Sequence, residues 1–144
     1  MTAARINKIQ HLWLILAFGA VVWWVGYGSH LLTGPSYDIA EIDIAEAREL
    51  INAGALVIDA RSEGAYDGRH IPGALLVPLT ILRAGIPDDL LLYKDKEIVV
   101  YCSKGLQVGP EATHILNQAG FSHAVNLKSG IEGWADAGQP VQHK

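Results

Sequence analysis

A block without any charged residue, residues 9–37, most constrains how this chain of 144 residues can fold. Its apolar centre covers residues 12–32, and a membrane-spanning helix needs about 20 mostly apolar residues. Aromatic side chains, which favour membrane interfaces, gather towards the two ends of this segment. They are Trp13, Trp23, Trp24 and Tyr27. The sequence therefore predicts a transmembrane helix over residues 12–32, preceded by a short tail over residues 1–11.

The basic residues around this segment predict its orientation. Arg5 and Lys8 precede it, and no Lys or Arg follows until Arg48. The positive-inside rule then keeps the N-terminus in the cytoplasm and places the rest of this single-pass protein outside it, in the periplasm if the source is a bacterium. A cleaved signal peptide is the alternative, but the long aromatic-rich core favours an uncleaved anchor.

Charge and cysteine content exclude several classes of protein. The formal charge is −4, with 11 basic and 15 acidic residues, so the chain is not a basic nucleic-acid binder. One cysteine, Cys102, excludes an intramolecular disulfide framework and a multi-cysteine metal site within the chain. The six histidines are scattered and show no metal-ligand spacing, so we expect no metal. From the net charge we expect no nucleic-acid partner.

After a short linker over residues 33–37, residues 38–144 alternate between strand and helix patterns. Asp43 is followed three residues later by Glu46, which is typical of a capped helix start, and Gly54 is a natural stop. The acidic run over residues 38–49 is interpreted as a solvated helix face. We expect strands over residues 55–58, 75–77, 97–101 and 124–127. Between and after them we expect a loop with one helical turn over 61–70, a helix over 80–93 interrupted by Gly85 and Pro87, a helix from Pro110 to Gly120, and a helix or turn over 130–134. A terminal loop over 138–140 follows. This alternation predicts an α/β domain with a mostly parallel central sheet flanked by helices.

Cys102 falls between the clearest strand and the next helix, where α/β proteins bind ligands. The loop from Cys102 to Gln107 can direct backbone N–H groups at an anion, the helix N-terminus adds a positive dipole end, and Lys104 adds a full charge. These features stabilise negative charge on the sulfur, as a thiolate or as a persulfide. A buried inert cysteine is the alternative, but Ser103 and Gly105 are poor neighbours for a core residue.

Several separated motifs, in order, resemble those of a single-domain rhodanese over roughly residues 38–141. The motifs are the strand end Val57-Ile58-Asp59-Ala60-Arg61, the segment from Tyr66 through His70-Ile71-Pro72-Gly73-Ala74, the strand Ile98-Val99-Val100-Tyr101 leading into Cys102, and the later segments Ala119-Gly120-Phe121, Leu127 to Trp134 and Ala137 to Val141.

The resemblance implies a sulfurtransferase without a cofactor, in which Cys102 takes sulfur from a donor such as thiosulfate and becomes a covalent persulfide. A thiol or protein acceptor then removes the sulfur. By the same resemblance the substrate-binding residues are Ser103, Lys104, Gly105, Leu106 and Gln107. Their backbone amides hold the small anionic donor, and the charge of Lys104 attracts it.

The active-site loop departs from the family pattern because it contains no Arg, which many members carry, and this leaves the physiological donor open. Val108 stands where a Cys-based phosphatase needs an Arg, which counts against that chemistry. Asp59 and Arg61 are interpreted first as structural, with a supporting role near the donor as the alternative. The functional alternatives are a membrane-anchored binding or scaffold module and a thiol redox relay with a partner protein.

Overall fold

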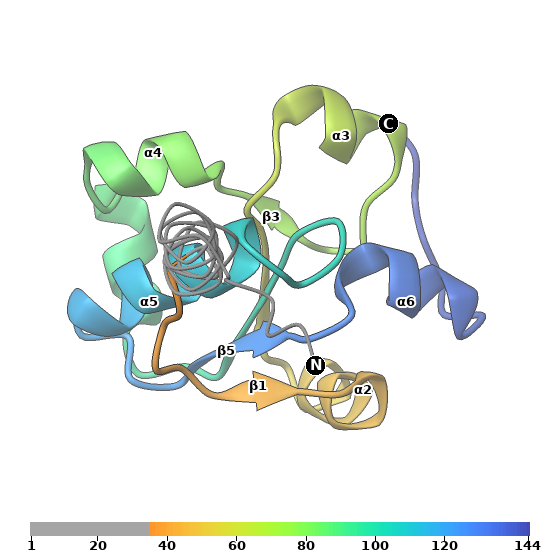
Figure 1. Cartoon of the computed structure of the whole chain (residues 1–144), viewed down its shortest axis with the longest axis horizontal. Helices are drawn as coiled ribbons and strands as arrows, with labels where there is room; N and C mark the ends of the chain where they lie inside the picture. Colours follow the sequence, from red (N-terminus) through yellow and green to blue (C-terminus); the bar gives the residue numbers. More distant parts are fainter. Residues whose placement is uncertain (1–34) are drawn as a thin grey trace, which may run out of the picture. The chain divides into compact units, whose positions relative to one another are not determined.

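A five-stranded, all-parallel sheet organises residues 35–144, the part of the chain that the computed structural model describes (Figure 1). The strand order is β1-β5-β4-β2-β3. The strands are β1 (Glu41–Ile42), β2 (Leu56–Asp59), β3 (Leu75–Leu76), β4 (Ile98–Tyr101) and β5 (Ala124–Leu127). The predicted α/β fold with a parallel sheet is confirmed.

The helices follow the expected alternation. They are α2 (Ile44–Asn52), α3 (Glu63–Gly68), α4 (Leu79–Ala84), the 3-10 helix η1 (Asp88–Tyr93), α5 (Val108–Gln118) and α6 (Gly130–Asp136). The predicted capping box is present at α2, where Asp43 Oδ1 accepts a hydrogen bond from the Glu46 backbone N–H at 2.9 Å and the Asp43 N–H donates to Glu46 Oε2 at 3.0 Å. The interrupted helix is also confirmed, because α4 ends before Gly85 and η1 begins after Pro87.

The predicted membrane helix over residues 12–32 lies outside the described residues. Within residues 35–144, the helices are all too short or too polar to span a bilayer.

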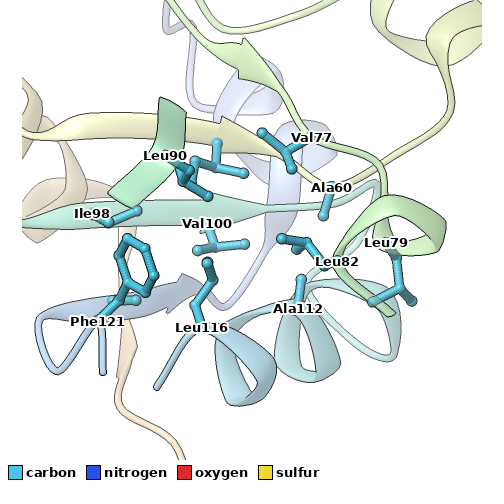
Figure 2. Close-up of a cluster of buried hydrophobic side chains, with 12 residues drawn as sticks. Ala60, Val77, Leu79, Leu82, Leu90, Ile98, Val100, Ala112, Leu116 and Phe121 are labelled. Carbon is cyan, nitrogen blue, oxygen red and sulfur yellow. The ribbon is translucent and has the colours of Figure 1, made fainter. Parts of the chain in front are cut away.

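Side chains of β4 alternate between two apolar layers, as the pleat of a strand requires. Ile98 and Val100 pack on one side with residues of α4 and α5, whereas Val99 and Tyr101 pack on the other side with residues of α2 and α6. Figure 1 shows these two pairs of helices on opposite sides of the sheet. Figure 2 shows the first layer, in which Phe121 and Leu116 lie beneath Ile98 and Val100. Since all four β4 side chains are fully buried, the end of this strand is a rigid support for the loop that begins at Cys102.

Two elements differ from the sequence interpretation. The acidic run over residues 38–49 is not one helix face, because Glu41 and Ile42 form β1 beside β5. A strand of two residues has no periodicity of its own and exists through this pairing. In addition, the chain beyond the predicted terminal loop forms an antiparallel bridge, in which the backbones of Gln142 and His70 exchange two hydrogen bonds of 2.8 Å.

Candidate active site

Cys102 lies directly after β4 and before α5, at the carboxyl end of the sheet's central strand. Its exposed fraction is 5%. The Sγ atom accepts a hydrogen bond from the backbone N–H of Gly105 at 3.2 Å. One loop amide is thus directed at the sulfur, in the loop where the sequence predicts backbone N–H groups that face an anion.

The loop can take this shape because two glycines allow close packing against the segment before α6. Gly105 has a φ of +72°, and a Cβ there would lie 2.1 Å from the Lys128 carbonyl oxygen. Gly130 has a φ of +58°, and a Cβ there would lie 2.4 Å from the Cys102 carbonyl oxygen. Any larger residue at either position would push the two segments apart.

Backbone hydrogen bonds fasten the start of the loop to α6. The Ile131 N–H donates to the Cys102 carbonyl at 2.9 Å, and the Glu132 N–H donates to the Ser103 carbonyl at 3.0 Å. The first turn of a helix has free N–H groups, and here the loop satisfies two of them. The sulfur-bearing residue is therefore fixed by β4 on one side and by α6 on the other.

Asn126 of β5 is a functional candidate that the sequence interpretation missed. Its side chain is fully buried, and its Nδ2 donates to the Gly105 carbonyl at 3.1 Å and to Glu41 Oε1 at 2.9 Å. Its Oδ1 is buried without a hydrogen-bond partner among the described residues. This Oδ1 lies against Gly109, where an added Cβ would be 2.4 Å from it and 3.3 Å from Cys102 Sγ. A polar amide within the apolar run over residues 124–127 was the available signal.

A pocket of about 690 Å³ opens over Cys102. It is lined by Ala60, Arg61, Ser62, Ala65, Pro78, Leu79, Thr80, Cys102, Ser103, Lys104, Leu106, Gln107 and Val108. Four of the five predicted substrate-binding residues thus lie in its wall, and the fifth, Gly105, is buried beneath the loop with its amide on the sulfur.

Two cations contribute to the pocket wall, and each already faces a carboxylate. Lys104 Nζ lies 3.9 Å from Glu132 Oε2, and both side chains are exposed, at 66% and 45%. Arg61 is only 10% exposed and binds the buried Asp59 carboxylate through Nε at 2.9 Å and Nη2 at 2.6 Å. Burial works to lower the pKa of Arg61, but the hydrogen bonds and charge of Asp59 outweigh it and raise that pKa above its usual value. Arg61 is therefore charged throughout the physiological range.

The Asp59–Arg61 pair joins three parts of the chain, which supports the structural interpretation of both residues. Arg61 Nη2 also donates to the Arg69 carbonyl at 2.6 Å, and its guanidinium lies 5.6 Å from the centre of the Tyr101 ring. The Tyr101 hydroxyl accepts a hydrogen bond from the Ile71 N–H at 3.1 Å. Burial first, and then the neighbouring Asp59 charge, raise the pKa of Tyr101 far above its usual value, so this phenol stays protonated. Because Arg61 also lines the pocket, a supporting role near the donor stays a prediction.

Comparisons with known proteins agree with this geometry. Residues 43–137 match the model of the rhodanese-like domain. The chain is 37% identical over 98 residues to the probable adenylyltransferase/sulfurtransferase MoeZ of Mycobacterium tuberculosis, covering 66% of this chain but only 24% of that protein. It is 30% identical over 86 residues to a sulfurtransferase of Allochromatium vinosum, covering 60% of this chain and 77% of that one.

A solved structure shows the same fold. A rhodanese-related protein from Thermoplasma volcanium superposes with a TM-score of 0.63 at 28% identity, covering 73% of this chain and 99% of that one. The agreement of the domain match, the parallel sheet and the position of Cys102 leads to one conclusion: the chain belongs to the rhodanese-like family.

Proposed function

We propose that this protein is a sulfurtransferase that carries sulfane sulfur as a persulfide on Cys102. The observation that carries the proposal is the position of the sulfur, which lies at the end of β4, accepts the Gly105 N–H and opens into a pocket. The relatives from Mycobacterium tuberculosis and Allochromatium vinosum are themselves named sulfurtransferases, which supports the same chemistry here.

The reaction has two displacement steps. The Cys102 thiolate attacks the outer sulfur of the donor, the donor's S–S bond breaks, and its electron pair leaves with the remnant, which is sulfite if the donor is thiosulfate. An acceptor thiolate then attacks the terminal sulfur of the Cys102 persulfide and releases the Cys102 thiolate. The sulfur is anionic before the first step and after the second, and the Gly105 amide stabilises that charge without having to reorganise.

Intact mass spectrometry of the full chain tests this proposal. We expect a gain of one sulfur atom after incubation with a sulfane-sulfur donor, reversal by a small thiol, and no gain in Cys102→Ser. Serine differs from cysteine only by an oxygen in place of the sulfur, so loss of the adduct in a folded variant reports on chemistry. If the folded, reduced protein forms no adduct with thiosulfate, polysulfide or an organic persulfide, the sulfurtransferase proposal fails and a binding role is the better account.

We further propose that residues 12–32 anchor the chain in a membrane and that the rhodanese-like domain lies outside the cytoplasm. The support is the length of the uncharged apolar run and the position of Arg5 and Lys8 before it. A β-lactamase fused after Lys144 should protect bacteria from ampicillin and sediment with membranes, whereas the fusion lacking residues 12–32 should do neither. Protection with soluble reporter would instead indicate a cleaved signal, and absence of protection would contradict the orientation.

A further inference from the structure

The cations of the Cys102 pocket are poorly suited to a free dianion. Lys104 faces Glu132 at 3.9 Å, and Arg61 is held by Asp59. The Lys104–Glu132 pair is exposed, so its attraction is modest and salt-dependent. Even so, Glu132 places a negative charge beside the only exposed cation of the described pocket wall. A doubly charged donor that approaches Lys104 therefore also meets the repulsion of Glu132.

The rest of the pocket wall combines apolar side chains with small polar ones. About half of its lining residues have apolar side chains: Ala60, Ala65, Pro78, Leu79, Leu106 and Val108. Leu106 is 68% exposed although it stands in the reactive loop. A leucine this exposed adds little to the stability of the fold, whereas a ligand that covers it removes apolar surface from water. The pocket, of about 690 Å³, is open to solvent and has room for a donor larger than thiosulfate.

We propose that Leu106 and Glu132 set the donor specificity of Cys102, so that the pocket favours an organic persulfide with an apolar substituent over an inorganic dianion. This inference rests on the proposed sulfurtransferase function. In the reaction, the Cys102 thiolate attacks the terminal sulfur of R–S–SH, the donor's S–S bond breaks, and R–S⁻ leaves with the electron pair. The transferred sulfur keeps its proton and its oxidation level, so no oxidant or reductant is needed.

Two stable sulfur donors test whether charge and apolar contact determine the preference of Cys102, because both transfer the same kind of sulfur atom. Thiosulfate and benzenethiosulfonate deliver the same sulfane sulfur, but the second carries an aromatic ring and one negative charge fewer. We would measure the second-order rate constant of persulfide formation on the full chain with each probe by quenched intact mass. Each constant is divided by the rate constant for the reaction of free N-acetylcysteine with the same probe, which corrects for the intrinsic reactivity of that probe. We expect the corrected ratio to favour benzenethiosulfonate by about tenfold or more, because the ring covers apolar wall.

Single substitutions then assign the preference to its residues. Leu106→Ser should lower the ratio about fivefold, since it removes the exposed apolar contact. Leu92→Ser is the matched control, because Leu92 is 82% exposed in η1 and does not line this pocket, and it should leave the ratio unchanged. Glu132→Gln should raise the thiosulfate rate about threefold at low salt, and the gain should fade as salt screens the charges.

Each failure has a distinct meaning. A corrected thiosulfate rate equal to or above the benzenethiosulfonate rate overturns the donor preference and leaves the sulfurtransferase function intact. An unchanged ratio in both Leu106→Ser and Glu132→Gln overturns their assignment as specificity residues. No persulfide from either probe, in protein whose Cys102 still reacts with a small alkylating reagent after denaturation, overturns the proposed function and this inference together.

Discussion

At the scale of single residues, the polar side chain of Asn126 joins the loop over residues 102–107 to the sheet. Its Nδ2 holds the Gly105 carbonyl, and the N–H of that same residue donates to Cys102 Sγ. A buried amide is costly unless its hydrogen bonds are made, and here one of its two polar atoms stays unpaired among the described residues. The structure thus keeps a partly unsatisfied side chain bonded to the residue whose N–H contacts the sulfur.

Replacing Asn126 should therefore lower the rate of persulfide formation by more than the loss of folding stability alone would explain. We expect Asn126→Ala to lower the maximal rate of persulfide formation about tenfold, with a smaller change in the donor concentration at half-maximal rate, because the loop amide loses its support. The free energy of unfolding should fall by about 1–3 kcal/mol.

The matched control for Asn126 is Thr113→Val. Thr113 is also fully buried, and its Oγ1 donates to the Gly109 carbonyl at 2.9 Å within α5. This variant loses a buried hydrogen bond but keeps the loop support, so it should lose stability without a comparable loss of rate. Equal rate losses in the two variants would contradict a positioning role for Asn126.

At the scale of elements, the pocket walls come from helices that are tied to one another at the surface. Arg83 in the last turn of α4 binds Glu111 in the first turn of α5, with Nε–Oε1 and Nη2–Oε2 distances of 2.7 and 2.8 Å. Both helices also line the pocket, through Leu79 and Val108. The hydrogen bond from Arg83 lowers the pKa of Glu111 below 4.5, although partial burial works in the opposite direction.

This pair predicts the sign of a pH effect on stability. A carboxylate whose folded pKa is depressed contributes stability above its unfolded pKa and loses that contribution as pH falls through the folded pKa. Arg83→Gln should therefore be less stable than the parent near neutral pH, and the difference should shrink at acidic pH, as Glu111 becomes protonated in the folded protein. Urea denaturation at several pH values measures this. Arg48→Gln, at an exposed arginine of α2, should show no such convergence, and a difference independent of pH would rule out the pair as its source.

At the scale of the whole molecule, sequence patterns predicted the elements that depend on residues close to one another in the chain. The capping box of α2, the buried strand β4 and the interruption after α4 each follow from neighbouring residues, and the structure confirms all three. The location of Cys102 at a strand end also followed from the order of elements. Strand β1 and the bridge between Gln142 and His70 were not predicted, because both form only through partners distant in sequence.

In the candidate site, too, the sequence predicted the residues of one loop but not the contacts made by residues distant in the chain. The loop residues could be named from the resemblance to the rhodanese family, but the carboxylate beside Lys104 could not be predicted, since Glu132 comes from α6. The role of Asn126 likewise depends on Glu41, 85 positions earlier in the chain. Long-range contacts decide how the site is charged and supported, and residue types alone do not reveal them.

The segment over residues 139–144 binds α6 and the region around α3. Trp134 Nε1 donates to the Pro140 carbonyl at 2.9 Å, and the Lys144 backbone N–H donates to the Asp67 carbonyl at 3.0 Å. Deletion of residues 139–144 removes these bonds and the pairing of Gln142 with His70. It should lower the free energy of unfolding by about 1–3 kcal/mol, as judged by urea denaturation. Lys144→Ala should stay within about 0.5 kcal/mol of the parent, because its side chain is exposed. A deletion as stable as the parent would show that the segment only rests on the surface.

The shortness of strand β1 has a consequence for how steadily Glu41 contacts Asn126. Within the described residues this strand contains two residues at the edge of the sheet and pairs with β5. Bonds from the Asn126 and Lys128 N–H groups to the Ala40 and Ile42 carbonyls flank this pairing. Short edge elements open locally far more often than the core unfolds. An opening of β1 would withdraw Glu41 from Asn126, and the loop over residues 102–107 would then lose part of its support at the rate of edge fraying rather than of global unfolding.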